Sequence, residues 1–400
     1  MSLLLVDQPS TKELQSTLIP EFERSSGIDV SVEIVPESGL DAKLATAMSG
    51  NQAQYDVVMT GAKNLGTLVS SGWLQPLDDL VAKSDEAYTA GFPETLIQNL
   101  KISDKSYAMP YQVGADMLFY NKDHLTKAGL DAANPPKTLD EVVAAAAKLK
   151  QASKVTPFVA RGSREGNENS FSWLMLWFLE GGRWPENAKG TVQQDAAVLT
   201  EAPAIKATEA YFKLLGEFGP DGAANYTFAE AQKAMQDGRA SMWIDAAQLG
   251  PALEGDGSKV AGKVGYQALT GKGGDDYNVG AVWGFSIAKA TQDPTDSFEL
   301  IEFLTSKETG VAQVVSGTNG STGRTDVLED ADVKKALNPE FVAALTEAIA
   351  HTNPAYTPNI PEGPQIRGAL ALSLSQGLTS TRDAAKTMKA ASDQVKGISK

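Results

Sequence analysis

The chain has 400 residues, with 35 Lys and Arg against 50 Asp and Glu, so its formal charge is −15, and it contains no Cys and two His. An acidic chain without a basic run disfavours nucleic-acid binding through phosphate contacts. The absence of Cys excludes disulfides, Fe–S clusters and cysteine nucleophiles, and two His are too few for a multi-histidine metal site. The sequence therefore predicts a globular protein with no metal and no cofactor.

The first residues are expected to form a strand. Met1–Val6 has no cationic segment and too short an apolar run for a signal peptide, so Met1-Ser2-Leu3 is expected to stand where an export signal has been removed. No apolar run reaches the ~18 residues that a membrane span needs.

The N-terminal part of the chain alternates between strand and helix patterns. Strands are predicted at 3–6, 30–34 and 55–59, and a helix at 40–48. Ser10-Thr11-Lys12-Glu13 has capping-box spacing, with Ser10 as the cap of a helix that ends at Gly27 and that Pro20 should kink. This alternation favours an α/β fold with a largely parallel sheet.

The same pattern recurs further along the chain. A strand pair broken near Gly114 is expected within 107–120, and Thr138 starts a second capping box before a helix. The apolar helix 171–180 is expected to be buried on all sides. Further strands are predicted at 155–160, 241–245, 264–268 and 282–287, and 271–276 is interpreted as a hairpin turn and not as a phosphate-binding loop.

A chain of this length exceeds the ~250–300 residues of a single core, which predicts two lobes. Irregular stretches near 112–116, 262–265 and 317–323 are the candidate crossings between them. The predicted lobe 1 comprises 1–113 and 264–317, and the predicted lobe 2 comprises 114–263 and 318–400.

Motifs for common catalytic sites are missing from the sequence. It has no G-x-S-x-G and no H-E-x-x-H, and His124 and His351 are isolated, so a Ser/His/Asp triad is disfavoured. Two carboxylates can meet in space from any positions, so a secreted glycosidase-like enzyme stays open as the alternative.

Polar and aromatic residues gather where predicted elements end. Asp245 follows Trp243 at a strand end, Trp283 precedes a glycine, and Arg161 lies shortly before Phe171. Sugar rings stack on aromatic faces, and their hydroxyls need Asp, Asn, Gln or Arg partners. Each residue also has a purely structural interpretation: a strand Trp in the core, Asp245 as a helix cap, or Arg324 paired with a nearby acid.

Several stretches occur in the order of a known family and span nearly the whole chain. They include Tyr55-Asp56-Val57-Val58, Gly72-Trp73-Leu74-Gln75-Pro76-Leu77-Asp78, Tyr107-Ala108-Met109-Pro110-Tyr111, Phe119-Tyr120-Asn121-Lys122-Asp123, Gly238-Arg239-Ala240-Ser241-Met242-Trp243-Ile244-Asp245, Trp283-Gly284-Phe285-Ser286-Ile287 and the Pro-rich segment 358–364. The chain thereby resembles the extracellular solute-binding proteins of bacterial ABC sugar importers, the family that includes the maltose-binding proteins. Within it, Arg161-Gly162 and Gly166-Asn167-Glu168-Asn169 before an apolar helix are similar to the branch that binds polyols and small sugars.

The resemblance implies a two-lobed periplasmic-binding-protein fold of type II, with discontinuous lobes joined by a hinge that close on one ligand without catalysis. It implies an extracytoplasmic monomer, periplasmic or lipid-anchored, that delivers a small carbohydrate or polyol to a membrane permease. Carried over by position, the ligand-binding residues would be Gln8, Glu37, Gly61, Gln112, Asp116, Asn169, Phe171, Asp245, Trp283, Arg324 and Glu362. The polar and aromatic pattern described above adds Arg161 and Trp243 to these candidates.

Two departures from the maltose-binding pattern narrow the expected ligand. Gly114 stands where those relatives have an acid, and their aromatic C-terminal platform is reduced to Gly363-Pro364-Gln365. A monosaccharide, disaccharide or polyol is therefore expected in place of a long malto-oligosaccharide. A metal complex as the solute is disfavoured by the His and Cys counts.

Overall fold

A computed structural model of the protein describes residues 1–49, 54–185, 192–353, 356–358, 360 and 362–398. The chain forms two compact units: unit 1 is Met1–Gly114 with Ala281–Leu337, and unit 2 is Ala115–Gly280 with Asn338–Lys400. Within the Pro-rich segment named above, 359 and 361 lie outside the described residues.

The compact units divide the chain differently from the predicted lobes at the second and third crossings, which were expected at 263 and 317. Residues 264–267 belong to unit 2 because this strand pairs with Leu118–Asn121 of the same unit. Residues 318–337 belong to unit 1 because the helices at 325–328 and 331–336 pack on the helix at 307–315.

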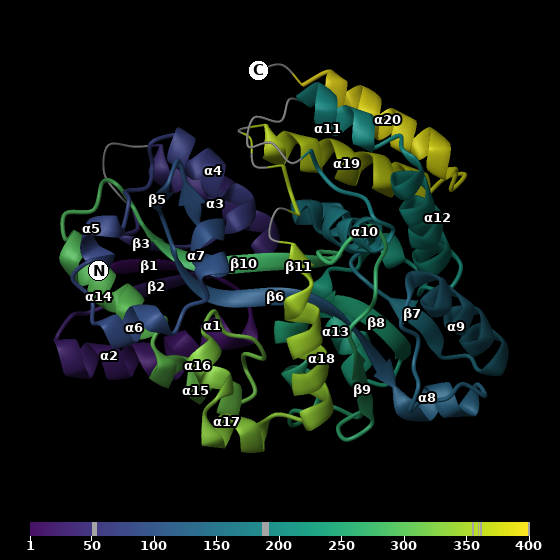
Figure 1. The fold of residues 1–400 in the computed structure, drawn as a ribbon, viewed down its shortest axis with the longest axis horizontal. Helices are drawn as coiled ribbons and strands as arrows, with labels where there is room; N and C mark the ends of the chain where they lie inside the picture. The colour runs from purple at the N-terminus through teal and green to yellow at the C-terminus, as the bar shows by residue number, and fades with distance from the viewer. Residues whose placement is uncertain (50–53, 186–191, 354–355, 359, 361, 399–400) are drawn as a thin grey trace. The chain divides into compact units, whose positions relative to one another are not determined.

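Unit 1 is built on parallel strands with helices between them (Figure 1). Strand β1 (Ser2–Val6) pairs in parallel with β2 (Ser31–Val35) and β3 (Val57–Gly61), and the second half of β10 (Asn278–Ile287) pairs antiparallel with β3. The other elements are α1 (Pro9–Glu13), η1 (Leu14–Leu18), α2 (Ile19–Ser26), α3 (Glu37–Met48), α4 (Ala62–Ser70), α5 (Asp78–Val81), α6 (Glu86–Ala90), α7 (Glu94–Asn99), β4 (Lys101–Ile102), β5 (Lys105–Ser106), α14 (Pro294–Leu304), α15 (Lys307–Val315), α16 (Thr325–Leu328) and α17 (Ala331–Ala336).

The first helix begins earlier than predicted. Gln8 is its cap, Pro9 occupies the first turn, and the Ser10 hydroxyl accepts a hydrogen bond from Gln112 Nε2 at 3.0 Å. The prediction of Ser10 as the cap is therefore wrong, because Pro suits the first helical position, where its missing N–H costs nothing. Pro20 follows directly on the wider π-helical turn η1 and is accommodated in the first turn of α2.

Unit 2 is built on strands β6 to β9, which pair in both directions. Strand β8 (Ala240–Ala246) pairs in parallel with β7 (Thr156–Val159) and antiparallel with β6 (Met109–Asn121), whose second half also pairs with β9 (Val264–Gln267). The other elements are α8 (Lys122–Lys127), α9 (Leu139–Ala152), η2 (Glu165–Asn167), α10 (Glu168–Leu179), α11 (Val192–Val198), α12 (Ala202–Gly216), η3 (Ala223–Asn225), α13 (Phe228–Gln236), η4 (Ala247–Leu249), η5 (Pro251–Leu253), α18 (Pro339–Ala350), β11 (Thr352–Asn353), α19 (Gly363–Leu378) and α20 (Ala384–Lys396).

Two expectations about the strands are corrected. The strand pair broken at Gly114 is one continuous strand, β6, of 13 residues that are all buried. The turn at 271–276 does not connect a hairpin, because β9 pairs with β6 while β10 pairs with β3 and β11. With several antiparallel pairs present, the sheet is mixed and not largely parallel.

The buried cores of the two units confirm the apolar segments predicted from the sequence. Helix α10 is buried along nearly its whole length, with Trp173 and Trp177 stacked at a ring separation of 5.3 Å, and it packs against α12 and α19. Helices α11, α19 and α20 also pack together, as Figure 1 shows. In the described part of the chain no helix has the length and apolar character of a membrane span.

Candidate functional site

The strongest polar feature of unit 2 is a buried ion pair between Arg161 and Asp245. Arg161 follows β7 and Asp245 lies near the end of β8; because these two strands are parallel, their carboxyl ends meet at one edge of the sheet. Arg161 Nη2 donates to Asp245 Oδ1 at 2.6 Å and Nε donates to Oδ2 at 2.9 Å. The exposed fractions are 6% for Arg161 and 0% for Asp245, so the guanidinium orientation is fixed.

Aromatic rings and a second acid complete the surroundings of Arg161. The guanidinium carbon lies 4.6 Å from the Phe171 ring centre and 5.3 Å from that of Phe228. Glu168 Oε2 lies 3.9 Å from Arg161 Nη1 and accepts a hydrogen bond from the Phe228 backbone N–H at 2.8 Å. The distances from the guanidinium to the two rings are typical of cation–π packing, and this packing places the Phe171 ring beside the ion pair.

Asp116 on β6 lies near the same ion pair. Its backbone is held by Asn278, which accepts from the Asp116 N–H and donates to its carbonyl, both at 2.8 Å. Both of its carboxyl oxygens are buried, and neither has a hydrogen-bond partner among the described residues. Burial first, and then the charge of Asp245, raise the pKa of Asp116 well above its usual value, against the opposing effect of Arg161. A carboxyl group in its neutral form can donate a hydrogen bond to the hydroxyl group of a ligand or accept one from it.

The other predicted ligand-binding residues of unit 2 are Trp243, Asn169 and Glu362. Trp243 is fully buried, packs on Phe119 at 5.0 Å, and donates from Nε1 to Asp245 Oδ2 at 3.2 Å, so it supports Asp245 from within the core. Asn169 donates to a backbone carbonyl of α19 at 2.8 Å, and its buried Oδ1 has no partner among the described residues. Glu362 is half-buried at the start of α19, where its charge helps raise the pKa of Asp195 to about 6, although burial is the larger cause.

Unit 1 holds a second cluster, around Trp283 on β10. Trp283 lies opposite Gly61 on β3, and a Cβ atom at Gly61 would come within 3.5 Å of the indole ring. Lys63 Nζ lies 4.9 Å from the Trp283 ring centre and 2.7 Å from Glu37 Oε1. The structure thus brings Glu37, Gly61 and Trp283 together through Lys63, which was not among the predicted residues.

Gln8 and Gln112 form a separate polar contact in unit 1. Gln8 Nε2 donates to Gln112 Oε1 at 2.8 Å, and the Gln112 amide donates in turn to the Ser10 hydroxyl. Gln112 is buried and Gln8 is half-buried, so this pair links the loop after β1 to strand β6.

The Arg324 guanidinium bonds to other groups of unit 1. It donates to both carboxyl oxygens of Asp326 at 2.9 and 2.7 Å and to the Tyr88 carbonyl at 3.0 Å, and its guanidinium carbon lies 4.6 Å from the Phe92 ring centre. Among the described residues no contact joins it to Trp283 or Gln112. Its contacts match the alternative structural interpretation of a pair with Asp326.

Three side chains in these clusters were not predicted: Lys63, Glu168 and Phe228. Glu168 belongs to the stretch Gly166–Asn169 that carried the polyol resemblance, so a signal existed for it. Phe228 directly follows the helix cap Thr227, and no local pattern distinguishes it from an ordinary apolar residue in the first turn of α13.

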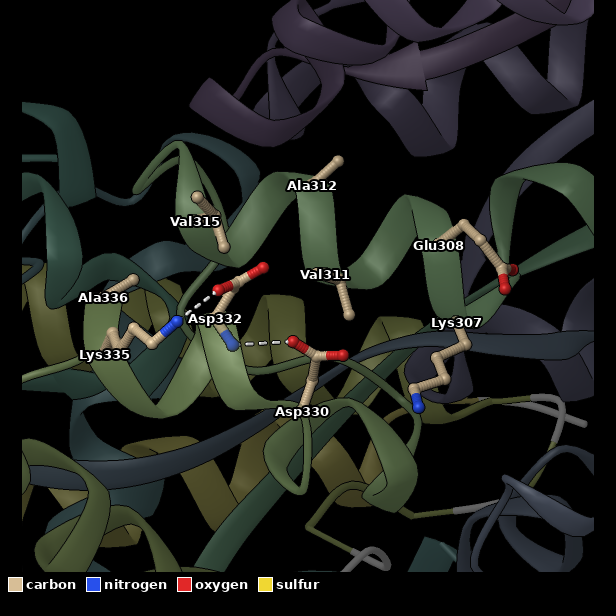
Figure 2. Close-up of a pocket in the computed structure, with 9 residues that line it drawn as sticks. All are labelled: Lys307, Glu308, Val311, Ala312, Val315, Asp330, Asp332, Lys335 and Ala336. Atoms are coloured by element: carbon tan, nitrogen blue, oxygen red, sulfur yellow. Dashed lines mark hydrogen bonds and ion pairs between the residues drawn. The ribbon is translucent and has the colours of Figure 1, made fainter.

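A surface groove of about 700 Å³ in unit 1 contains none of the predicted residues. It lies between α15 and α17, with Val311, Ala312 and Val315 along one side (Figure 2). On the other side Lys335 pairs with Asp332 at 2.9 Å. In the parts of the chain that the structure describes, no cluster of three His, Asp or Glu could hold a metal ion.

Comparison with known proteins identifies what the chain is similar to. Residues 8–311 match the family of bacterial extracellular solute-binding proteins. The chain is 26% identical to a probable ABC transporter-binding protein of Deinococcus radiodurans, over 79% of this chain and 74% of that protein. It is also 26% identical to the mannitol-binding protein of Pseudomonas aeruginosa, over 72% of this chain and 66% of that protein.

The same similarity extends to solved structures. An ABC transporter solute-binding protein of Agrobacterium radiobacter K84 in complex with ribitol matches with a TM-score of 0.88 and 25% identity, over 99% of this chain and 98% of that one. Together these matches confirm the predicted two-lobed periplasmic-binding-protein fold and the resemblance stated from the sequence.

Proposed function

Because the chain belongs to the family of bacterial extracellular solute-binding proteins, we propose that it is a receptor for a small polyol or sugar. One of the proteins compared above is a mannitol-binding protein, and another is in complex with ribitol. Both compounds are acyclic and uncharged. The receptor would deliver its ligand, unchanged, to the permease of an ABC importer, and would act outside the cytoplasm as a monomer.

The Asp116–Arg161–Asp245 arrangement carries this proposal. Asp245 fixes Arg161 through two hydrogen bonds, and Asp116 keeps both oxygens unpartnered among the described residues. A buried polar group without a partner is costly, so a ligand hydroxyl that bonds to Asp116 would regain that energy. In unit 1, Trp283 beside Gly61 would offer an apolar face, with Glu37, Gln8 and Gln112 as further hydrogen-bonding groups. Asn169, through its unpartnered oxygen, is the next candidate in unit 2.

A purely binding role fits this chemistry better than the glycosidase alternative. A glycosidase needs one carboxyl group as acid and a second as base or nucleophile. Asp245 is engaged by Arg161, Trp243 and its neighbouring backbone N–H, and Glu168 is engaged by Arg161 and the Phe228 N–H, so both other acids of the cluster already hold structural contacts. No glycosidase is among the relatives named above.

Ligand binding is expected to act by closure. A ligand that contacts the protein better in a closed form stabilises that form, so binding shifts the population of conformations. Strands β6 and β10 pass from one unit to the other at Gly114 and Gly280, and we propose them as the segments that absorb the backbone change.

A thermal-melt screen tests the proposed function. The panel comprises D-mannitol, ribitol, erythritol, D-sorbitol, D-tagatose, maltose and glucose, each tested after the protein has been unfolded, dialysed and refolded to remove any bound solute. A ligand at 100 times its Kd stabilises by about 2.7 kcal/mol, which raises the Tm by a few degrees. We expect one or two acyclic polyols to raise the Tm. A panel without any shift would contradict the assignment to polyols and small sugars, and release of product from p-nitrophenyl glycosides would support the glycosidase.

A further inference from the structure

Asn278, the first residue of β10, holds the main chain of Asp116 with its side chain. Asn278 Oδ1 accepts a hydrogen bond from the Asp116 N–H, and Nδ2 donates to the Asp116 carbonyl oxygen, both at 2.8 Å. The exposed fractions are 3% for Asn278 and 6% for Asp116. Because a main-chain N–H can only donate and a carbonyl can only accept, these two bonds fix which end of the Asn278 amide is oxygen and which is nitrogen.

The Asn278 amide stands in for a neighbouring strand at this point of β6. Strand β9 pairs with β6 from Leu118 to Asn121 and does not reach Asp116. On the opposite edge of β6, Asp116 lies across from Ala246 of β8. A carboxamide carries the same kind of donor and acceptor as a peptide group, so Asn278 supplies the two hydrogen bonds that a neighbouring strand would otherwise make.

The main chain of Asn278 is itself fixed. Its N–H donates to the His351 carbonyl oxygen at 2.9 Å, and Asn278 lies opposite Thr352 where β10 and β11 pair in parallel. Asp116 is therefore held on both edges of β6, by β8 on one side and by an anchored amide on the other. Because a side chain leaves a strand in a direction set by its main chain, these contacts fix the direction of the Asp116 carboxyl group.

We propose that Asn278 is a positioning residue of the polyol site: its amide holds the main chain of Asp116 so that the Asp116 carboxyl group meets a hydroxyl group of the ligand. This inference rests on the proposed function, in which Asp116 bonds to that hydroxyl. Ligand-binding groups lose their effect when their supports let them shift by about half an ångström. Affinity should therefore depend on Asn278, although its own amide bonds to Asp116.

Titration calorimetry with D-mannitol and ribitol tests this role in Asn278→Ala. We expect the Kd to rise by about tenfold or more, because the N–H and carbonyl of Asp116 lose their partners. Asn121→Ala is the matched control. Asn121 is also on β6 and 3% exposed, and its side chain also bonds to the main chain, accepting from the His124 N–H at 3.1 Å. Both variants should have a lower Tm, but Asn121→Ala should keep its Kd within about twofold of wild type.

A double-mutant cycle separates positioning from a general weakening of unit 2. If Asn278 acts through the Asp116 carboxyl group, Asn278→Ala should change the Kd by less than about twofold in an Asp116→Ala background. In a Trp283→Ala background it should keep its full effect, because that residue belongs to the cluster of unit 1. Ligand-observed NMR measures the Kd of the weakest complexes.

Asn278→Asp is the milder variant, used if Asn278→Ala does not fold. It keeps the size of the side chain and an acceptor for the Asp116 N–H, but in its ionised form it has no donor for the Asp116 carbonyl. We expect the Kd for D-mannitol to rise by about threefold or more at pH 7.5. Asn121→Asp is its control, since it keeps the acceptor for the His124 N–H.

The outcomes separate this inference from the proposed function. If wild type binds a polyol and the variants of Asn278 bind it equally well, Asn278 does not position Asp116, and the receptor assignment stands. An equal loss of affinity in Asn121→Ala, or an undiminished effect of Asn278→Ala in the Asp116→Ala background, would show a general structural role and overturn the inference. If no polyol binds to wild type, the proposed function itself fails, and this inference with it.

Discussion

Arg161 and Lys63 each combine a cation with an aromatic ring, but in different settings. Arg161 is buried against Phe171, and Asp245 fixes the orientation of its guanidinium. Lys63 lies at the start of α4, paired with Glu37 and over the ring of Trp283. Under the proposed function, the first arrangement would orient hydrogen-bonding groups, and the second would offer the Trp283 indole as an apolar contact.

Trp283→Ala is expected to weaken binding of the preferred polyol by about 1–3 kcal/mol, because a large aromatic contact is lost. Trp283→Phe keeps a ring on β10 and should recover part of that loss. Titration calorimetry on both variants is the measurement, after their Tm values show that they are folded. An unchanged Kd in Trp283→Ala would mean that the indole serves the core of unit 1 only.

Asp116 gives a prediction about pH. Its pKa is raised in the folded state, so the folded protein binds this proton more tightly than the unfolded chain does, and stability falls as pH rises above the unfolded value of ~3.9. Asp116→Asn removes this dependence. The free energy of unfolding of the variant relative to wild type should therefore rise by up to about 1.4 kcal/mol per pH unit over the range in which the carboxyl group stays protonated in the fold.

Urea unfolding at pH 5 and pH 7.5 measures that difference, with Asp256→Asn as the exposed control. A variant-minus-wild-type difference that is equal at the two pH values would show that Asp116 ionises normally in the folded protein.

At the scale of elements, the capping-box motif predicted one helix start correctly and another incorrectly. Thr138 accepts from the Glu141 N–H at 3.3 Å while Glu141 accepts from the Thr138 N–H at 3.2 Å, as its capping-box spacing predicted. The equivalent motif at Ser10 does not cap, because Pro9 takes the first helical turn and shifts the cap to Gln8. Identical spacing therefore gives different caps when a neighbouring residue competes for the position.

Thr138→Ala should destabilise unit 2 by about 1 kcal/mol, because the Glu141 N–H loses its acceptor. Thr138→Ser retains the hydroxyl and should stay within a few tenths of a kcal/mol of wild type. Ser10→Ala is the comparison variant, because the Ser10 hydroxyl accepts a hydrogen bond from Gln112 and does not cap the helix. Chemical denaturation of the three variants tests the assignment, and an equal stability of Thr138→Ala and wild type would contradict it.

At the scale of the whole molecule, β6 and β10 pass from one compact unit to the other, and the chain also crosses after Leu337. If ligand binding closes the protein, the radius of gyration in small-angle scattering should decrease when D-mannitol or ribitol is added at saturation. The same solute should have no effect on an Asp245→Ala variant, because Arg161 then loses the carboxylate that orients it. An unchanged radius with a bound ligand would exclude closure as the mechanism.

The sequence by itself determined the order of strands and helices, the buried character of α10 and, through motifs in family order, the kind of receptor. These properties depend on residues close together in the chain, whose periodicity and spacing can be read directly. Only the tertiary structure decided which polar groups meet. Arg161 and Asp245 are 84 residues apart and pair because β7 and β8 run in parallel side by side. The pair of Arg324 with Asp326 is local in the chain and was one of the two interpretations of the sequence. The bond from Arg324 to the Tyr88 carbonyl, and the lack of a side-chain partner for Asp116 among the described residues, follow from the tertiary structure.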